Sequence, residues 1–254
     1  MNAINKLFEE KKKNILSIYF TAGFPKLNDT TVILNELIST GVDMIEIGIP
    51  FSDPLADGPT IQRSSEAALK NGMSLKLLLE QLQTANCKLP TLLMGYLNPV
   101  LQFGVENFCK RSSEVGIRGV IIPDLPMEEY ISEYKSIFEK YNLKNIFLIT
   151  PQTSEKRIRM IDEYSDGFIY MVSSSSTTGV KKGIDAEKEK YFKRIKEMKL
   201  KNPLVVGFGI SDKKSFSKAC EYANGAIIGS AFINSLEKSS NLRVSINKFI
   251  ESLK

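Results

Sequence analysis

The chain has 254 residues, of which 43% are hydrophobic and 25% charged, a balance typical of a globular protein rather than a disordered, fibrous or membrane protein. Lys and Arg number 34 against 29 Asp and Glu, and the resulting formal charge of +5 is too mild to indicate a nucleic-acid-binding surface. The chain contains no His, which excludes Ser-His-Asp and Cys-His catalysis and His-ligated zinc, so acid-base chemistry falls to carboxylates, Tyr, Lys or Cys.

Three cysteines, Cys87, Cys109 and Cys220, lie far apart and form no C-x-x-C pair. This spacing indicates neither a disulfide framework nor a structural metal site, and we interpret all three as small packing residues. The N-terminus lacks the apolar region of a signal peptide, and no apolar run approaches the roughly 18 residues of a membrane span. We therefore expect a cytoplasmic protein without a metal centre, a nucleic-acid partner or a membrane partner.

The first predicted element is a short helix over residues 4–12, in which Ile4, Leu7 and Phe8 form one apolar stripe. We interpret it as a plug over the bottom of the fold rather than as a membrane anchor. Eight short apolar runs rich in β-branched residues then predict strands at 15–20, 44–49, 91–94, 119–122, 145–149, 167–172, 204–207 and 225–228.

Longer polar stretches separate these runs, with apolar residues at helical spacing such as Leu34, Leu37 and Ile38. Eight βα units without a linker predict a single domain, residues 1–254, folded as a closed (β/α)8 TIM barrel with an additional N-terminal helix. An open, doubly wound α/β sheet is the alternative. In a barrel, function is expected at the carboxyl ends of the strands.

Glu46 is the first candidate catalytic residue. Alternation along the strand 44–49 places Met44, Glu46 and Gly48 on one face and three isoleucines on the other. Because isoleucines suit the helix-facing side, Glu46 is expected to point into the barrel, where its carboxyl must be paired, hydrogen-bonded or protonated. The alternative is a buried ion pair, but no Lys or Arg occurs at the upper end of a predicted strand, so we favour a catalytic role.

The loop that follows this strand, residues 50–59, carries Asp53 and Asp57 among three Pro and one Gly. Both could simply stabilise a turn or cap a helix, which is the commonest use of Asp in such a loop. Above the same strand as Glu46, however, the loop offers a second carboxylate that could hydrogen-bond a developing cation while Glu46 transfers a proton.

Two glycine turns follow the last two predicted strands, Gly207-Phe208-Gly209 and Gly229-Ser230. Each opens a helix, and phosphate-binding barrels hold phosphate in these two loops on free backbone N–H groups. One such turn would indicate only a change of chain direction. Two turns at the two expected places favour a phosphorylated substrate.

Residues 173–179, which follow the sixth predicted strand, are Ser and Thr ending in Gly179. We interpret this segment as a lid over the site, the alternative being an ordinary flexible loop. Gly179 could add an N–H to the phosphate site. Tyr170, on the strand before it, faces the barrel interior if the alternation holds, where it could also serve only for packing.

The chain closely resembles the tryptophan synthase α subunit family. The resemblance runs nearly end to end, through residues 19–23, 46–59, 94–96, 123–126, 207–211 and 229–231. The segment 46–59, Glu-Ile-Gly-Ile-Pro-Phe-Ser-Asp-Pro-Leu-Ala-Asp-Gly-Pro, is the family's signature and is very specific, whereas the glycine turns occur in many phosphate-binding barrels.

The resemblance implies a lyase that splits indole-3-glycerol phosphate into indole and glyceraldehyde 3-phosphate by a retro-aldol route, with no cofactor in this chain. On the family pattern Glu46 protonates carbon 3 of the indole and helps to remove the glycerol hydroxyl proton, while Asp57 hydrogen-bonds the indole N–H. Protonating an aromatic carbon needs a carboxylic acid that is still protonated near neutral pH, and the resulting cation needs an ionised carboxylate nearby.

The same resemblance implies further contacts. Tyr170 would orient Glu46, and Thr178 would meet Asp57 when the lid closes. The other substrate-binding residues would be Tyr19, Tyr96 and Phe208, and the phosphate-binding residues would be Gly179, Gly209, Gly229 and Ser230.

The resemblance also implies a partner. The family works as an α2β2 heterotetramer whose β subunit binds pyridoxal phosphate, receives indole through a tunnel and joins it to serine. Asp53 and Pro54 match positions at the contact with that subunit, so the loop that carries Asp57 would also touch the partner.

The chain departs from many family members at Ser174 and Ser176, where they carry an Arg and a Gly. The difference bears on the lid and on communication with the partner rather than on the reaction. Two other readings remain open: another phosphate-binding barrel enzyme and a non-catalytic subunit that only activates a partner. A Schiff-base aldolase needs a Lys that residues 168–172 lack, and intact Glu46 and Asp57 argue against a non-catalytic subunit.

Overall fold

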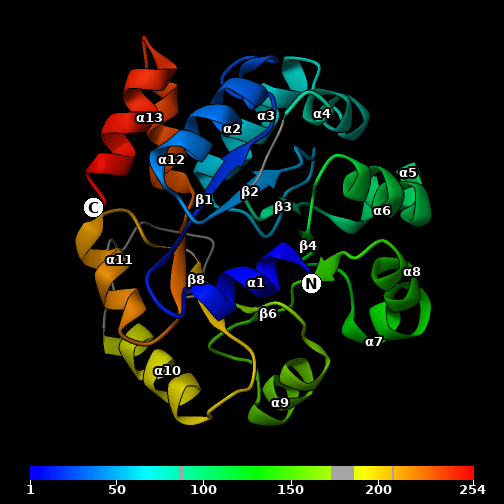
Figure 1. Ribbon diagram of the computed structural model, residues 1–254, viewed down its shortest axis with the longest axis vertical. Helices are drawn as coiled ribbons and strands as arrows, with labels where there is room; N and C mark the ends of the chain where they lie inside the picture. The colour runs from blue at the N-terminus through cyan, green and yellow to red at the C-terminus, as the bar shows by residue number, and fades with distance from the viewer. Residues whose placement is uncertain (86–88, 173–185, 208) are drawn as a thin grey trace.

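A parallel sheet occupies the centre of the molecule and helices surround it (Figure 1). The computed structural model describes residues 1–85, 89–172, 186–207 and 209–254. The strands are β1 (Ile15–Thr21), β2 (Met44–Gly48), β3 (Thr91–Met94), β4 (Gly119–Ile121), β5 (Lys144–Asn145), β6 (Leu148–Ile149), β7 (Ile169–Val172), β8 (Leu204–Gly207) and β9 (Gly225–Ile228).

The sheet closes at the fifth predicted strand, which the structure divides into β5 and β6. In the order β5-β4-β3-β2-β1-β9-β8-β7-β6 these two stand at opposite ends of the sheet, yet only two residues separate them in the chain. The N–H of Ile146 donates to the carbonyl of Val120 on β4, and the N–H of Tyr170 on β7 donates to the carbonyl of Phe147. Both ends of the sheet therefore meet in one segment, which confirms the predicted barrel, and the open doubly wound sheet is wrong.

Helices form the outer layer of the barrel. They are α1 (Ala3–Glu10), α2 (Asp29–Thr40), α3 (Pro59–Lys70), α4 (Leu75–Leu82), α5 (Leu97–Phe103), α6 (Val105–Glu114), α7 (Met127–Glu129), the π-helical η1 (Tyr130–Tyr134), α8 (Lys135–Lys140), α9 (Glu155–Tyr164), α10 (Ala186–Glu197), α11 (Lys213–Cys220), α12 (Ser230–Glu237) and α13 (Leu242–Glu251). Local sequence sets several ends: Pro59 is at the first position of α3, and Gly41 ends α2 with a φ of 80°. No helix within the described ranges is both long and apolar enough to cross a membrane.

Helix α1 lies across the centre of the ring in Figure 1, at the end of the barrel where the strands begin. Ile4 and Phe8 of this helix are buried. A side chain at Gly119, the first residue of β4, would meet Ile4 at 2.7 Å, and the ring of Phe8 packs against Phe168, just before β7, at 5.7 Å between centroids. These contacts confirm α1 as a plug over the bottom of the barrel.

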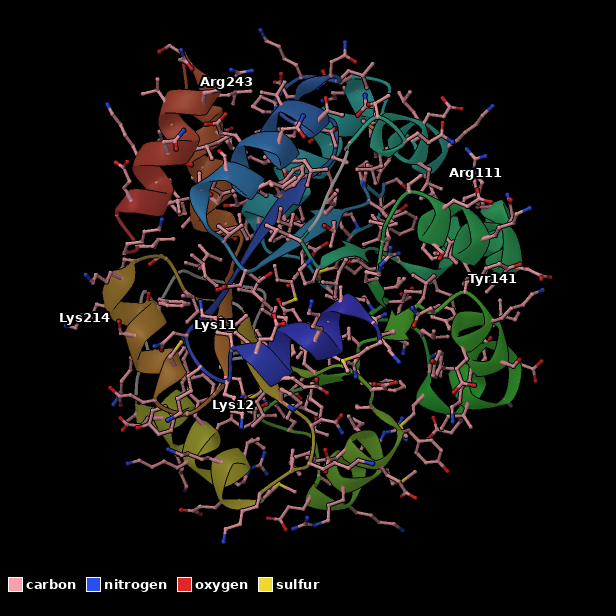
Figure 2. The ribbon with its side chains drawn as sticks, viewed as in Figure 1. Lys11, Lys12, Arg111, Tyr141, Lys214 and Arg243 are labelled. Atoms are coloured by element: carbon pink, nitrogen blue, oxygen red, sulfur yellow. The ribbon has the colours of Figure 1, made fainter. Side chains whose placement is uncertain are left out.

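The basic side chains are spread over the periphery. Arg111, Lys214 and Arg243 lie at the rim of the molecule, on three different helices (Figure 2). Lys11 forms an ion pair with Asp43 at 2.6 Å next to the plug helix. This distribution agrees with the interpretation of the positive charge as solvated surface. Cys109 and Cys220 are buried free thiols, as expected for packing residues, and Cys87 lies outside the described residues.

Candidate active site

A cavity of about 290 Å³, its open mouth included, lies over the carboxyl ends of neighbouring strands. Tyr19 reaches it from β1, Asp57 from the loop after β2 and Tyr96 from the end of β3. The complete lining is Tyr19, Ile49, Asp57, Ser65, Met94, Gly95, Tyr96 and Pro123. Since (β/α)8 enzymes bind their substrates at this end of the barrel, the cavity is the candidate active site.

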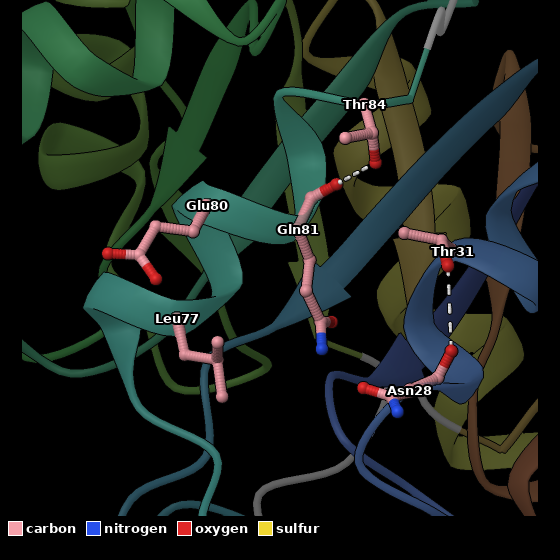
Figure 3. Close-up of a pocket in the computed structure, with 6 residues that line it drawn as sticks. All are labelled: Asn28, Thr31, Leu77, Glu80, Gln81 and Thr84. Atoms are coloured by element: carbon pink, nitrogen blue, oxygen red, sulfur yellow. Dashed lines mark hydrogen bonds between the residues drawn. The ribbon is translucent and has the colours of Figure 1, made fainter.

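A second hollow lies on the outer side of the barrel between α2 and α4 (Figure 3). The side chain of Gln81 extends from α4 towards α2 and its Nε2 donates to the carbonyl of Leu27 at 2.9 Å. The lining is Asn28, Thr31, Leu77, Glu80, Gln81 and Thr84. None of the predicted site residues lines this hollow.

Glu46 lies inside the barrel with no exposed surface, and no other Asp, Glu, Lys or Arg among the described residues is so completely buried. The hydroxyl of Ser17 donates to its Oε1 at 2.9 Å, and its Oε2 has no hydrogen-bond partner in the described part of the chain. Burial raises the pKa of Glu46 to about 8, an effect that the Ser17 hydrogen bond partly offsets. None of the ion pairs between described residues includes Glu46, so the alternative of a buried ion pair does not hold there.

The strand register places Tyr19 directly beside Glu46 on the neighbouring strand. The hydroxyl of Tyr19 lies over Gly48, where an added Cβ would meet it at only 2.1 Å. A side chain larger than hydrogen at position 48 would therefore displace Tyr19. Tyr19 therefore fills the space that a side chain at Gly48 would occupy.

Tyr170 points into the barrel from β7, as the alternation predicts. It is buried, and a Cβ on Gly207 of β8 would lie 2.1 Å from its hydroxyl oxygen. Burial raises the pKa of Tyr170 well above its ordinary value, and the nearby charge of Glu46 adds to this effect. Tyr170 and Glu46 therefore share the interior of the barrel.

Asp57 is fixed at the mouth of the cavity by Tyr96. The Tyr96 hydroxyl donates to Oδ2 of Asp57 at 3.1 Å and accepts the backbone N–H of Ala56, also at 3.1 Å. The ring of Phe51 stacks on Tyr96 with centroids 4.9 Å apart. Burial raises the pKa of Asp57 to about 6, and the Tyr96 hydrogen bond opposes that rise. The N-cap of α3 is Gly58, so Asp57 is not a helix cap in this structure.

The two carboxyl groups consequently prefer different protonation states at neutral pH. Glu46, with a pKa of about 8, is mainly protonated, whereas Asp57, with a pKa of about 6, is mainly ionised. Two titratable groups whose surroundings separate their pKa values in this way are suited to act as an acid and as a charge stabiliser.

The two predicted phosphate turns differ. Asp212 caps α11 by accepting the N–H of Ser215, and Gly209 lies in the loop before that helix with a φ of 76°. Helix α12 has Gly229 at its N-cap and no side-chain cap, and it begins at Ser230. An added Cβ on Gly229 would lie 3.3 Å from the ring of Tyr19, so this helix start adjoins the cavity.

Several predicted residues lie outside the described residues: Ser174, Ser176, Thr178, Gly179 and Phe208. Asp53 is exposed and Pro54 partly buried on the loop after β2, and next to them Leu55 is 85% exposed. Leu55, an apolar residue in a polar loop, was not predicted as part of the site. Ser17 was not predicted either, although a serine at an inward position of an apolar strand indicates a polar contact inside the barrel.

The fold and the site define a (β/α)8-barrel enzyme with one carboxylate inside the barrel on β2 and a second on the loop that follows β2. Residues 5–254 match the family model described as "Tryptophan synthase alpha chain". The alpha chain of Flavobacterium psychrophilum is 58% identical over the full length of both chains, and that of Bacteroides thetaiotaomicron is 54% identical over the full length of both.

Solved structures agree with these relatives. Tryptophan synthase subunit alpha from Legionella pneumophila superposes with a TM-score of 0.88 at 33% identity, covering 100% of this chain and 97% of that one. A chain of the aminoacrylate-bound tryptophan synthase from M. tuberculosis superposes with a TM-score of 0.86 at 27% identity, covering 100% of both.

The chain therefore belongs to the tryptophan synthase alpha chain family. It is an enzyme of tryptophan biosynthesis and a lyase, as the sequence resemblance implies. Alpha chains of this family need no cofactor of their own. No group of three or more Cys, Asp or Glu placed to hold a metal ion occurs in the part of the chain that the structure describes.

Proposed function

We propose that the chain cleaves indole-3-glycerol phosphate into indole and glyceraldehyde 3-phosphate, with Glu46 as the acid-base and Asp57 as the stabiliser of the cation. The observation that carries this proposal is the placement of two carboxyl groups on one strand and the loop after it, Glu46 inside the barrel without exposed surface and Asp57 at the mouth of the cavity. Burial raises the pKa of Glu46 to about 8 and that of Asp57 to about 6. The protonated acid and the ionised carboxylate that the reaction needs are therefore both present near pH 7.

In the proposed reaction Glu46 gives its proton to carbon 3 of the indole ring. The ring becomes an indoleninium-like cation, and Asp57 accepts a hydrogen bond from the indole N–H as positive charge develops. The glycerol hydroxyl next to the ring then loses its proton to the Glu46 carboxylate. The carbon–carbon bond breaks, its electrons restore the aromatic indole, and the released fragment becomes an aldehyde, so that Glu46 ends protonated again.

The binding groups are proposed partly from the lining of the cavity and partly from the family resemblance. Tyr19 and Tyr96 line the cavity beside Asp57, where they would contact the indole, and Tyr170 would orient Glu46. The uncapped start of α12 at Gly229 and Ser230 offers backbone N–H groups to the phosphate. Further phosphate contacts are proposed at Gly209 and Gly179, and contacts to the substrate at Thr178 and Phe208.

The proposed assembly is a cytoplasmic α2β2 heterotetramer with a β subunit that carries pyridoxal phosphate, and this chain would form one domain over residues 1–254. The exposed loop with Asp53, Pro54 and Leu55 is the proposed contact with that subunit. It is continuous with Asp57, so partner binding and the position of a catalytic carboxylate would be coupled through one short segment.

The test is glyceraldehyde 3-phosphate release from indole-3-glycerol phosphate by the purified chain, with and without a β subunit. We expect turnover that rises when the β subunit is added. Glu46→Gln should abolish indole release and leave the fold and partner binding intact. Absence of turnover from folded wild-type protein in both conditions would instead support a non-catalytic subunit.

A further inference from the structure

Ser17 makes the one side-chain hydrogen bond to Glu46 within the described part of the chain. It joins the serine hydroxyl to Oε1 over 2.9 Å, and neither residue has exposed surface. Bulk solvent therefore does not reach this contact, and its geometry is set by the barrel. No step of the proposed reaction depends on contact between this serine and the substrate.

Ser17 approaches Glu46 from the end of the barrel at which the strands begin. In the pairing of β1 with β2, Ser17 stands opposite Met44 and Tyr19 stands opposite Glu46. Because a strand rises about 3.3 Å per residue, Ser17 lies roughly 7 Å earlier along β1 than Tyr19, which lines the cavity. Ser17 thus holds the carboxyl group from the side away from the cavity.

We propose that Ser17 is a positioning residue that holds Oε1 of Glu46, so that the transferable proton is carried by Oε2. A hydroxyl that donates to one carboxyl oxygen makes that oxygen an acceptor, and the proton of the neutral acid then resides on the other oxygen. Oε2 has no partner among the described residues, so no other described side chain holds its proton. This inference rests on the proposed function, because it concerns the proton that the indole receives.

Other ionisable groups face Glu46, and their titrations must be distinguished from that of Glu46. Tyr19 on β1 and Tyr170 on β7 lie close enough for the charge of Glu46 to raise their pKa values further above the ordinary range, where burial has already placed them. Both therefore stay neutral while Glu46 titrates. Asp57, from the loop after β2, titrates at a lower pH.

Ser17 serves both halves of the reaction. Before proton transfer it fixes which oxygen carries the proton, and afterwards the same donor stabilises the carboxylate that removes the hydroxyl proton. Loss of the hydroxyl should therefore affect the chemical step rather than substrate binding, which depends on the cavity above.

The test is Ser17→Ala in the full chain. Protein labelled with ¹³C in its glutamate carboxyl groups is titrated by NMR without substrate, and Glu46→Gln identifies the Glu46 signal. We expect the midpoint to move above that of the wild type, because the ionised form loses its donor. We also expect kcat to fall about tenfold with KM unchanged, since an interaction of the chemical step is lost. Ser17→Thr, which keeps a hydroxyl, should move both values back towards the wild type.

The matched control is Ser112→Ala, which removes a buried serine hydroxyl from α6 without touching Glu46. It should change neither the titration nor kcat. A wild-type midpoint in Ser17→Ala, or an equal loss of kcat in both alanine variants, would overturn the inference. Failure of the proposed function is recognised separately, by turnover that persists in Glu46→Gln, whereas the substrate-free titration reports on Ser17 in either case.

Discussion

The hydroxyl of Tyr96 at the end of β3 donates a 3.1 Å hydrogen bond to Oδ2 of Asp57 on the loop after β2. This bond joins two neighbouring segments at the mouth of the cavity. It also favours the ionised form of Asp57 against the burial that raises its pKa to about 6. One phenol thus sets both the position and the charge of the second carboxylate.

Tyr96→Phe removes this donor and leaves the ring that stacks on Phe51. We expect the pKa of Asp57 to rise further, so the low-pH limb of the kcat/KM profile moves to higher pH, and kcat/KM at pH 7 falls by about tenfold, the size typical of a lost hydrogen bond to a charged group. The measurement is kcat/KM against pH. Tyr141→Phe, which removes an exposed phenol bonded to Glu106, is the control and should leave the limb in place. An unmoved limb in Tyr96→Phe would contradict this role.

The wild-type enzyme should show a bell-shaped dependence of kcat/KM on pH, because the pKa values of the free enzyme appear in that ratio. The active form has Asp57 ionised and Glu46 protonated, so the rate falls as pH drops through about 6 and as it rises through about 8. Single-turnover measurements keep product release out of the profile. Activity still rising above pH 9 would show that Glu46 is not the acid.

Burial of Glu46 should also make stability depend on pH. Its pKa is about 8 in the folded chain against an ordinary value of 4.5, so the folded state binds the extra proton and loses stability as pH rises between these values. Glu46→Gln removes this loss. We expect its melting temperature relative to the wild type to be higher at pH 9 than at pH 5, by an amount that corresponds to a few kcal/mol. Equal differences at the two pH values would contradict the raised pKa.

Gly48→Ala should displace Tyr19, because an added Cβ would lie 2.1 Å from its hydroxyl oxygen and 2.6 Å from Cζ. Overpacking of this kind costs about 1–3 kcal/mol of unfolding free energy. Tyr19→Leu removes the atoms that collide, so the double variant should be more stable than the sum of the two single changes predicts. Denaturant unfolding of the four proteins measures this coupling, and strict additivity would show that the contact is relieved in another way.

Because the start of α12 has no side-chain cap, a charge introduced there should weaken phosphate binding without lowering stability. Ser230→Asp places a negative charge in the first turn, where it suits the helix dipole but repels the substrate phosphate. We expect KM to rise at least about tenfold with no loss of thermal stability, because a repulsion of roughly 1.4 kcal/mol has this effect. Asn241→Asp at the N-cap of α13 is the control and should leave KM unchanged. A wild-type KM in Ser230→Asp would place the phosphate elsewhere.

The alternation in residues 44–49 was enough to predict that Glu46 faces inward, because a strand with helices on one side assigns its isoleucines to that side. The division of residues 144–149 into β5 and β6 could not be predicted, since it depends on pairing with β4 on one side and β7 on the other. The Ser17–Glu46 bond likewise depends on the register between strands 29 residues apart in sequence. The sequence does distinguish the start of α11 from that of α12, because Asp212 and Ser215 match a capping pair. The glycines before the two helices do not make this distinction.

The exposed loop predicts how the partner acts on the site. Asp53 lies on the surface four residues before Asp57, and its Oδ2 accepts a hydrogen bond from the hydroxyl of Ser52 at 2.5 Å. If the β subunit stabilises this loop by contacting Asp53, Asp53→Ala should lower partner-induced activation severalfold while turnover of the isolated chain is unchanged, because Asp57 keeps its bond to Tyr96. Titration of the variant with β subunit, followed by glyceraldehyde 3-phosphate release and by light scattering, measures activation and association separately. Glu155→Ala, an exposed carboxylate at the start of α9, is the matched control. If Asp53→Ala leaves both association and activation at the wild-type level, the loop does not couple the partner to Asp57.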